Sequence, residues 1–199
     1  MYEPSFRFAK TTDIEVIVAL VQSAYRGEAS RAGWTTEVEF LDGQRTDPVE
    51  VGELLTRSDS RMLLAEKDGR LLACCHLEKQ GTRCYFGMFA VVPGMQGAGL
   101  GRHTLDTAEH FARVEWGCHS MEMQVIDLRV KLIAWYERCG YRRSGIYQPF
   151  PYDNARFGLP KQPNLRFEML CKTLVFDSPQ VVVSPGDDNN PSSIMRNTR

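Results

Sequence analysis

Apolar positions along the first sixty residues indicate one strand followed by two helices. Residues 6–8 alternate apolar and polar side chains, which is the period of a strand. Apolar side chains then recur at helical spacing from 14 to 25, after Thr and Asp residues that can cap a helix. The Asp-Pro pair that opens residues 47–55 predicts a second helix. Residues 26–34, rich in glycine and charge, are expected to form a loop.

From residue 61 the spacing changes to that of a sheet. Residues 62–66, 70–78 and 84–92 are apolar runs separated by Asp-Gly and Gln-Gly-Thr turn sequences. They predict an antiparallel meander of three strands. Gly87 lies inside the third run, which indicates a bulge or a close approach of another backbone.

The second half of the chain alternates helices and strands. A glycine-rich turn leads into an amphipathic helix over about 99–115, and residues 120–126 follow as a strand. Because a helix crosses between them, we expect this strand to run parallel to the one that ends at Val92.

The remaining elements complete one mixed α/β domain. A helix is predicted over 129–139, where Gly140 can close it, and a strand over 141–147. Residues 148–164 are expected to form a long loop, and residues 166–172 alternate as a last strand. The predicted domain spans 1–176, and the Ser-, Pro-, Asn- and Asp-rich residues 177–199 are expected to be a flexible polar tail.

The amino-acid composition limits the kinds of partner that the protein is expected to bind. The chain has 43% hydrophobic and 25% charged residues, with 24 Lys and Arg against 25 Asp and Glu. This balance argues against a protein that holds nucleic acid or an anionic membrane mainly by bulk charge. No apolar run approaches the ~18 residues of a membrane span, and the N-terminus lacks the pattern of a signal peptide. We therefore expect a cytoplasmic protein with no nucleic acid and no membrane partner.

The six cysteines are expected to be reduced thiols. None forms a CxxC pair, and none stands at a zinc spacing from a histidine. Four of them lie in strand-like apolar runs, where cysteine is usually a small buried side chain. We expect no metal site.

The most informative segment runs from Val91 to Arg102. It passes from a strand through Gly97, Gly99 and Gly101 directly into a helix. Glycines let backbone N–H groups approach a ligand, and a helix start supplies unpaired donors and the positive end of a dipole. The segment therefore predicts a phosphate or pyrophosphate site, although the same glycines would also fit a plain turn.

Two nucleotide-binding motifs are absent from this loop. Gly101 is followed by Arg102 and His103, whereas a Walker loop needs Lys and Ser or Thr there. The spacing is GxGxG, whereas the dinucleotide fingerprint is GxGxxG. A nucleotide-binding protein is thus a disfavoured alternative, which competition between CoA and ATP would test.

The loop resembles the acetyl-CoA signature of the GCN5-related N-acetyltransferase (GNAT) family. Gln96-Gly97-x-Gly99-x-Gly101 follows a strand that ends in Val-Val-Pro, as in that family. A second family motif is similar to residues 134–141, which read Ala-Trp-Tyr-Glu-Arg-Cys-Gly-Tyr. The resemblance covers roughly residues 6–174. It implies a central mixed sheet of six to seven strands flanked by about four helices.

The resemblance also implies a function, an acetyl-CoA-dependent N-acetyltransferase that acts on a primary amine in a ternary complex without a metal. The tyrosine at the place of Tyr136 would be the general acid that protonates the departing CoA thiolate. Two neighbouring strands would splay apart to admit the thioester. The implied contacts to the pantetheine arm are the backbone groups of Phe89, Ala90 and Val91. Those implied for the pyrophosphate are the backbone groups of Gln96, Gly97, Ala98, Gly99, Leu100, Gly101 and Arg102.

The general base stays open at this point. Some relatives carry a glutamate where Gln124 stands, and many carry an asparagine where Arg129 stands. Glu122 and Glu78 are candidates, although either could be a solvated surface charge. Cys139 could be imagined as an acyl carrier, against the direct transfer usual in the family. The missing glutamate also leaves a non-catalytic acyl-CoA-binding or sensing module as an alternative function.

The acceptor is not defined beyond an amine on a small molecule or peptide. Glu28, Arg31 and Trp34 lie where this fold usually walls the acceptor pocket, and Tyr147 is expected on the opposite wall. A homodimer is the expected oligomer, as dimers are the commonest.

Overall fold

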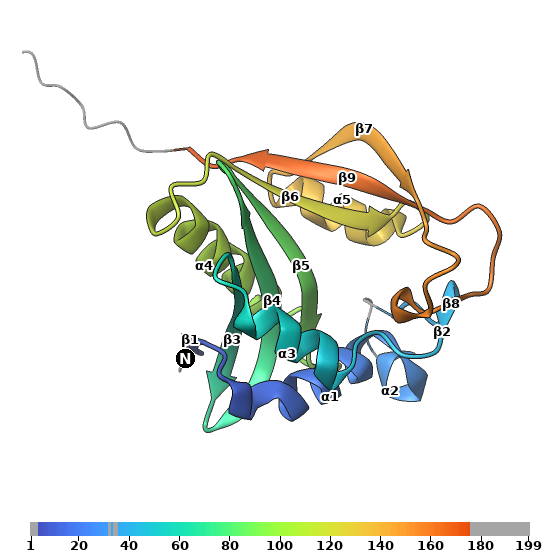
Figure 1. Cartoon of the computed structure of the whole chain (residues 1–199), viewed down its shortest axis with the longest axis horizontal. Helices are drawn as coiled ribbons and strands as arrows, with labels where there is room; N and C mark the ends of the chain where they lie inside the picture. The colour runs from blue at the N-terminus through green and yellow to red at the C-terminus, as the bar shows by residue number, and fades with distance from the viewer. Residues whose placement is uncertain (1–3, 32, 34–35, 176–199) are drawn as a thin grey trace, which may run out of the picture.

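A mixed sheet of seven strands forms the centre of the protein (Figure 1). The computed structural model describes residues 4–31, 33 and 36–175. All neighbouring strands run antiparallel except for one parallel pair, β5 and β6. The predicted fold class is therefore confirmed. In sheet order the strands are β1 (Ser5–Phe8), β3 (Ser60–Lys67), β4 (Arg70–Gln80), β5 (Arg83–Val91), β6 (Ser120–Ile126), β9 (Arg166–Thr173) and β7 (Arg142–Pro149).

Helices cover both faces of the sheet. The α-helices are α1 (Ile14–Tyr25), α2 (Gly27–Arg31), α3 (Pro48–Thr56), α4 (Leu100–Val114) and α5 (Val130–Arg138), and the 3-10 helices are η1 (Thr11–Asp13) and η2 (Ala155–Phe157). Apolar residues of α1 and α3 pack in one core cluster, and those of α4 and α5 in another. The predicted Asp-Pro helix start is confirmed, since the Asp47 side chain accepts a hydrogen bond from Glu50 N at 2.8 Å.

Strand β3 explains why the central strands are apolar on both sides. Met62 and Leu64 pack with α1 and α3, whereas Leu63 and Ala65 pack with α4 and α5. Successive side chains of a strand point to opposite faces, so a strand covered on both faces buries an uninterrupted apolar run. This arrangement fixes β3, β4 and β5 as a rigid support for the loops at their ends.

Strands β5 and β6 pair over only three residues and then separate. The parallel pairing joins 83–85 to 120–122, and no further pairs follow although both strands continue. Figure 1 shows the two ribbons diverging from this end. The register of β5 against β4 shifts between Cys74 and His76, and Met88 has a φ of 45°. These features confirm the bulge expected near Gly87, and they bend β5 away from β6.

Two predictions of local structure were wrong. Residues 27–31 form the short helix α2 rather than a loop, because Glu, Ala and Arg favour helix and outweigh the charge that suggested a loop. The long loop over 148–164 contains η2 and a strand, β8 (Leu159–Pro160), which pairs with β2 (Leu41–Asp42). Strands of two residues have no period, so only the tertiary pairing reveals them.

Three sequence predictions concern residues outside or at the limit of this description. Trp34 and the tail at 177–199 lie outside the described residues, so the predicted domain boundary stays a prediction.

Within the described ranges, no helix combines the length and apolarity needed to cross a membrane. Groups of His, Cys, Asp and Glu able to hold a metal ion are absent from the same part of the chain.

Candidate active site

Two cavities lie beside the gap between β5 and β6. We call the first the inner pocket; it has a volume of about 100 Å³, and Tyr25, Glu37, Arg45, Gln124, Arg129 and Tyr136 are among its lining residues. We call the second the glycine cleft; it has a volume of about 470 Å³, and Val91, Gln96, Gly97, Gly99, Trp135 and Arg138 are among its lining residues. Phe89 and Leu132 line both cavities. The two cavities are therefore adjacent, with Phe89 of β5 and Leu132 of α5 as shared walls.

The glycine cleft is built at the start of α4. Gly99 is the N-cap with a φ of 86°, and Gly97 has a φ of 90°, a left-handed conformation that other residues adopt at a cost. Gly99 has no side chain with which to cap α4, so the first N–H groups of the helix lack the usual N-cap partner. Nothing lies within 4 Å of where a β-carbon would stand on either glycine. This cradle of backbone donors at a helix start suits a phosphate or pyrophosphate.

The inner part of the cleft is apolar. The rings of Phe89 and Trp135 stack with centroids 6.2 Å apart and 26° between their planes. A β-carbon on Gly101 would lie 3.5 Å from Phe89 Cζ, so a larger residue there would crowd this wall. The cleft thus offers a polar mouth at the helix start and an apolar interior that leads to the gap between the strands.

Most of the residues predicted to bind the cofactor line this cleft. Those that do are Phe89, Val91, Gln96, Gly97, Gly99, Gly101 and Arg102. Ala90 and Leu100 instead contribute side chains to the core, and Ala98 is exposed outside the lining. The predictions for these three concern backbone groups, and they stay predictions.

The inner pocket contains a buried charged cluster. The carboxylate of Glu37 accepts hydrogen bonds from Arg26 Nη1 at 2.7 Å and from Arg129 Nη1 at 2.9 Å. All three side chains are less than a tenth exposed. The guanidinium of Arg45 lies 5.4 Å from the ring centroid of Tyr25, which also lines the pocket. Buried charges are stable only when they are paired, and here one carboxylate serves two guanidinium groups.

The arginines keep Glu37 ionised. Burial alone would raise the pKa of Glu37, but Arg129, Arg45 and Arg26 together hold that pKa below its ordinary value. A carboxylate with a lowered pKa is a weak base. Glu37 is therefore suited to neutralise the arginines rather than to remove a proton.

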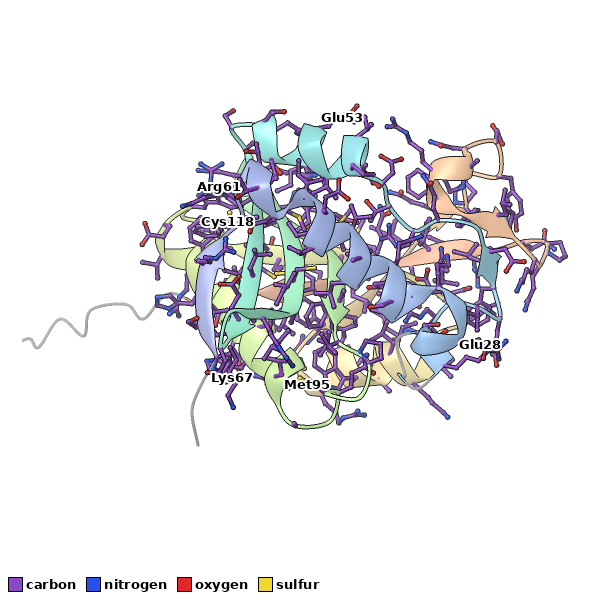
Figure 2. All side chains as sticks on the ribbon, turned by 90° about the horizontal axis from the view of Figure 1, so that it is seen from below. Glu28, Glu53, Arg61, Lys67, Met95 and Cys118 are labelled. Atoms are coloured by element: carbon purple, nitrogen blue, oxygen red, sulfur yellow. The ribbon has the colours of Figure 1, made fainter. Side chains whose placement is uncertain are left out.

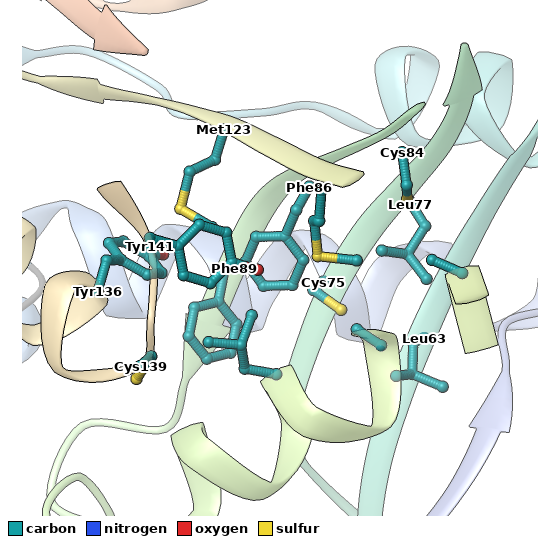
Figure 3. Packing of buried hydrophobic residues seen from close by; sticks show 14 of the residues in the cluster. Leu63, Cys75, Leu77, Cys84, Phe86, Phe89, Met123, Tyr136, Cys139 and Tyr141 are labelled. Carbon is teal, nitrogen blue, oxygen red and sulfur yellow. The ribbon is translucent and has the colours of Figure 1, made fainter. Parts of the chain in front are cut away.

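Tyr136 faces the same pocket from α5. Its ring packs edge-on against Trp135, with centroids 5.0 Å apart, and against Tyr141 at 5.7 Å. Figure 3 shows it among the packed side chains of the core near Phe89. Within the described residues its hydroxyl donates no hydrogen bond to the protein. Burial raises the pKa of Tyr136 well above 10, so the phenol keeps its proton.

Tyr25 fixes the strand beside this phenol. Its hydroxyl donates a hydrogen bond of 2.5 Å to the carbonyl oxygen of Phe89. Helix α1 thereby holds the part of β5 that borders both cavities. The contact gives Tyr25 a positioning role, since its own hydroxyl is occupied.

The two candidate bases lie outside the inner pocket. Glu78 is paired with Arg57 at 2.9 Å, and Glu122 with Arg83 at 3.2 Å. Neither is among the pocket lining residues. Gln124 does line the pocket, and its side-chain amide donates to Gln148 Oε1 at 2.9 Å.

The predicted acceptor residues are placed at the periphery. Glu28 and Arg31 form an exposed ion pair of 2.9 Å on α2, and Glu28 lies at the outer edge of the molecule in Figure 2. Tyr147 lies on β7, where the Arg166 guanidinium covers its ring at 4.0 Å. The structure brings none of these three into the lining of the inner pocket.

Cys139 is a buried thiol at the end of α5. Burial raises its pKa, so the thiol holds its proton and is a poor nucleophile. This argues against a role as an acyl carrier.

The sequence did not reveal the charged cluster. Glu37, Arg26, Arg45 and Tyr25 come from the end of α1 and from the segments that follow α2, and Arg129 lies 92 residues after its partner Glu37. A dense run of mixed charges over 26–39 was the only signal. Such a run is typical of a solvated surface, so the pairing can be read only from the fold.

The sheet thus opens between its two parallel strands, and a glycine cradle lies at the start of the following helix. The chain belongs to the GNAT acetyltransferase family, because the sequence model described as "Acetyltransferase (GNAT) family" matches residues 16–141. The resemblance stated from the motifs is thus confirmed, and the protein is an acyltransferase. None of the curated proteins matches the sequence.

Solved structures of N-acetyltransferases share the fold. The ribosomal-protein-S18-alanine N-acetyltransferase from Escherichia coli superposes with a TM-score of 0.65 at 13% identity, over 89% of this chain and 98% of that one. The spermidine/spermine N-acetyltransferase SpeG from Vibrio cholerae gives 0.62 at 14%, over 86% and 93%. A candidate phosphinothricin N-acetyltransferase gives 0.64 at 18%, over 87% and 99%. At these identities the likeness concerns the fold alone.

Proposed function

We propose that the protein is an acetyl-CoA-dependent N-acetyltransferase that moves an acetyl group directly to a primary amine of a small molecule or peptide. The observation that carries the proposal is the meeting of two cavities at Phe89 and Leu132. One cavity has the chemistry of a phosphate cradle with an apolar interior, and the other holds a protonated phenol. A donor and an acceptor bound in the two cavities would be held close enough for direct transfer.

The glycine cleft fits acetyl-CoA. The N–H groups at the start of α4 would hold the pyrophosphate, and Phe89, Leu132 and Trp135 would pack along the pantetheine arm. When bound, acetyl-CoA supplies an activated acetyl thioester. The bend of β5 away from β6 leaves room for that thioester between the strands.

Tyr136 is the proposed general acid. Its pKa lies well above 10 because the ring is buried, so it is protonated throughout the working range of pH. A thiolate leaving group has an ordinary pKa of about 8.5, which makes it able to take a proton from a positioned acid. The Tyr136 hydroxyl is free to donate toward the gap between the strands.

The acceptor amine is proposed to lose its proton before it reacts. The carboxylate that lines the inner pocket, Glu37, is held ionised by arginines and has a lowered pKa. Glu78 and Glu122, the bases predicted from the sequence, are committed to ion pairs outside the lining. We therefore propose that the neutral fraction of the amine in solution is the form that binds and attacks.

A reducing compartment such as the cytoplasm suits this chain. All six cysteines are free thiols, and five of them are buried. This supports the proposed location without requiring it for activity.

The first test is a thermal melt with acetyl-CoA, CoA, ATP and NAD in parallel. A ligand present at a hundred times its Kd stabilises the fold by about 2.7 kcal/mol. For a chain of this length we expect acetyl-CoA and CoA to raise Tm by roughly 5–11 °C and ATP and NAD to leave it unchanged. Release of CoA thiol in the presence of an amine panel then tests transfer. Binding without thiol release for any amine would instead support a non-catalytic sensor of acyl-CoA.

A further inference from the structure

We propose that the acceptor amine carries an anionic group, a carboxylate or a phosphate-type oxyanion, and that the guanidinium of Arg45 binds this group in the inner pocket. The inference names the substrate class of the site and rests on the proposed N-acetyltransferase function. It follows from the charge, the hydrogen bonding and the size of the pocket.

The pocket has an excess of positive charge. Its charged lining residues are Glu37, Arg45 and Arg129, and Arg26 lies directly behind as the second partner of Glu37. Arg26 and Arg129 therefore share the Glu37 carboxylate, and Arg45 adds a third guanidinium nearby, on which the Glu50 carboxylate outside the lining also acts. In addition, Nε and Nη2 of Arg26 are buried without a hydrogen-bond partner. Among the described residues the pocket lining carries two guanidinium groups and one carboxylate, and an anionic ligand would balance this net positive charge.

Arg45 is the member of this cluster that is available to a ligand. Within the described residues its side chain forms no ion pair and no hydrogen bond, whereas Arg26 and Arg129 both bind Glu37. Its side chain is partly buried and lies over the ring of Tyr25, a contact that leaves the N–H donors of the guanidinium unused. A guanidinium presents these donors as a planar fork, which matches a carboxylate or a phosphate.

Glu37 does not offer a second attractive site for a cation. Its Oε1 and Oε2 each accept an arginine hydrogen bond, and the arginines lower its pKa. A polyamine or another multiply charged cation would meet two lining guanidinium groups and a carboxylate already occupied. The cluster therefore favours acceptors of the opposite charge.

The size of the pocket agrees with a compact acceptor. Its volume of about 100 Å³ is well below the roughly 300–1,000 Å³ typical of sites for drug-sized ligands. The rings of Phe150, Phe157 and Phe167 also line it and provide an apolar wall. An amine with a short carbon frame and one oxyanion fits these surroundings.

The first experiment compares matched acceptors by thiol release with saturating acetyl-CoA. The anionic set is the protein amino acids and two aminoalkylphosphonates, and the neutral set is the amino acid amides and the corresponding amino alcohols. 1,3-Diaminopropane and spermidine represent cations. We expect kcat/KM, normalised to the neutral fraction of each amine, to be at least tenfold higher for the best anionic acceptor than for its neutral counterpart. Equal or faster turnover of the neutral or cationic set would overturn the inference. Comparison of kcat/KM between the carboxylate and the phosphonate acceptors then shows which of the two oxyanions the site prefers.

The second experiment uses Arg45→Gln with Arg61→Gln as the matched control. Arg61, labelled in Figure 2, is an exposed arginine on β3 that is not among the pocket lining residues. We expect Arg45→Gln to lower the ratio of anionic to neutral kcat/KM at least tenfold, mainly through KM, and Arg45→Lys to restore part of it. Arg61→Gln should leave the ratio unchanged. An unchanged ratio in Arg45→Gln would contradict the assignment of Arg45.

A third measurement on the wild-type protein does not depend on the variant folding. Small carboxylates and alkylphosphonates that lack an amine should inhibit competitively against the acceptor, whereas their amides and alcohols should not. Absence of this inhibition at concentrations tenfold above the acceptor KM would count against the anion site. Failure of the proposed function gives a different result, since no amine of any charge would then release CoA thiol.

Discussion

At the scale of single residues, Tyr136 gives the sharpest test of the chemistry. Tyr136 lines the inner pocket and its hydroxyl has no hydrogen-bond partner among the described residues, so Tyr136→Phe should remove an acid and little packing. We expect kcat to fall about 10²–10⁴-fold, the usual contribution of general acid catalysis, with KM for acetyl-CoA nearly unchanged. Thiol-release kinetics measure both quantities.

Tyr141→Phe is the matched control for this variant. Tyr141 is buried against Tyr136 in the same core cluster but lines neither cavity. Its removal should leave kcat within twofold of the wild type. If Tyr136→Phe kept full activity, Tyr136 would be a packing residue and the acid would have to be found elsewhere.

Glu37 is predicted to carry a large share of local stability. Glu37→Gln leaves Arg26 and Arg129 buried without a counter-charge, which should cost about 3–5 kcal/mol of unfolding free energy. Urea unfolding at pH 7 measures the loss. Glu28→Gln removes an exposed pair of the same residue types on α2 and should cost less than about 0.5 kcal/mol.

The pH dependence of this difference has a defined sign. The pKa of Glu37 is lower in the folded protein than its ordinary value of 4.5, so ionised Glu37 stabilises the fold above that pH. The stabilisation is lost as the pH falls below 4.5 toward the lowered pKa. The difference in unfolding free energy between the wild type and Glu37→Gln should therefore become smaller in acid. A difference that stayed constant with pH would contradict the pairing.

At the scale of the element, two glycines of the loop before α4 allow an effect on cofactor binding to be distinguished from an effect on stability. Gly94 and Gly99 have φ values of 87° and 86°, and a β-carbon on either would meet nothing within 4 Å. Alanine at either position should cost about 1–2 kcal/mol of unfolding free energy, because the left-handed conformation penalises a β-carbon. Gly99 lines the cleft and caps α4, whereas Gly94 does neither.

We therefore expect Gly99→Ala to raise KM for acetyl-CoA at least tenfold and Gly94→Ala to leave it unchanged. Urea unfolding and thiol release, measured on the same two variants, give the stability and the KM. Equal effects of both variants on KM would show that the loop acts only through its stability and would remove Gly99 from the cofactor site.

How well the sequence predicted each element depended on how local its signal was. The strand at 120–126 was predicted to the residue, and the helix predicted over 99–115 is α4 (Leu100–Val114), because apolar periods and glycine boundaries are encoded within those segments. The parallel pairing of β5 and β6 followed from the helix between them. The β2–β8 pair and the Glu37–Arg129 pair join residues about 90–120 apart, and no local period encodes such contacts.

At the scale of the whole molecule, the sheet divides the proposed reaction between two cavities with unlike chemistry. The glycine cleft is open and carries backbone donors, whereas the inner pocket is small and carries buried charge. The bend of β5 joins them, and Tyr25 holds that bend from α1 through Phe89 O. In the proposed reaction both substrates would therefore approach the same stretch of β5 from different sides, which is the arrangement that direct transfer requires.

This division predicts how the rate depends on pH. With Tyr136 protonated to well above pH 10 and Glu37 ionised, neither group changes its charge between pH 6 and 9. The acceptor amine alone then titrates, so log kcat/KM should rise with a slope of one up to the pKa of the amine and show no fall below about pH 10. For two acceptors whose amines differ in pKa, the pH at which the plateau begins should differ by the same number of pH units.

A plateau at one fixed pH below the amine pKa, the same for every acceptor, would instead reveal a base on the protein. Glu78→Gln and Glu122→Gln would then identify it. If one of these two predicted bases is responsible, the pH profile of the variant that lacks its carboxylate should no longer show the fixed plateau. His76 is a less suitable source, since burial lowers its pKa to about 4 and its Nε2 hydrogen-bonds Ser60 Oγ at 2.8 Å. The charges of the inner pocket favour another result, in which both glutamate variants keep the wild-type pH profile and the plateau follows the pKa of the amine. The amine would then lose its proton to solvent.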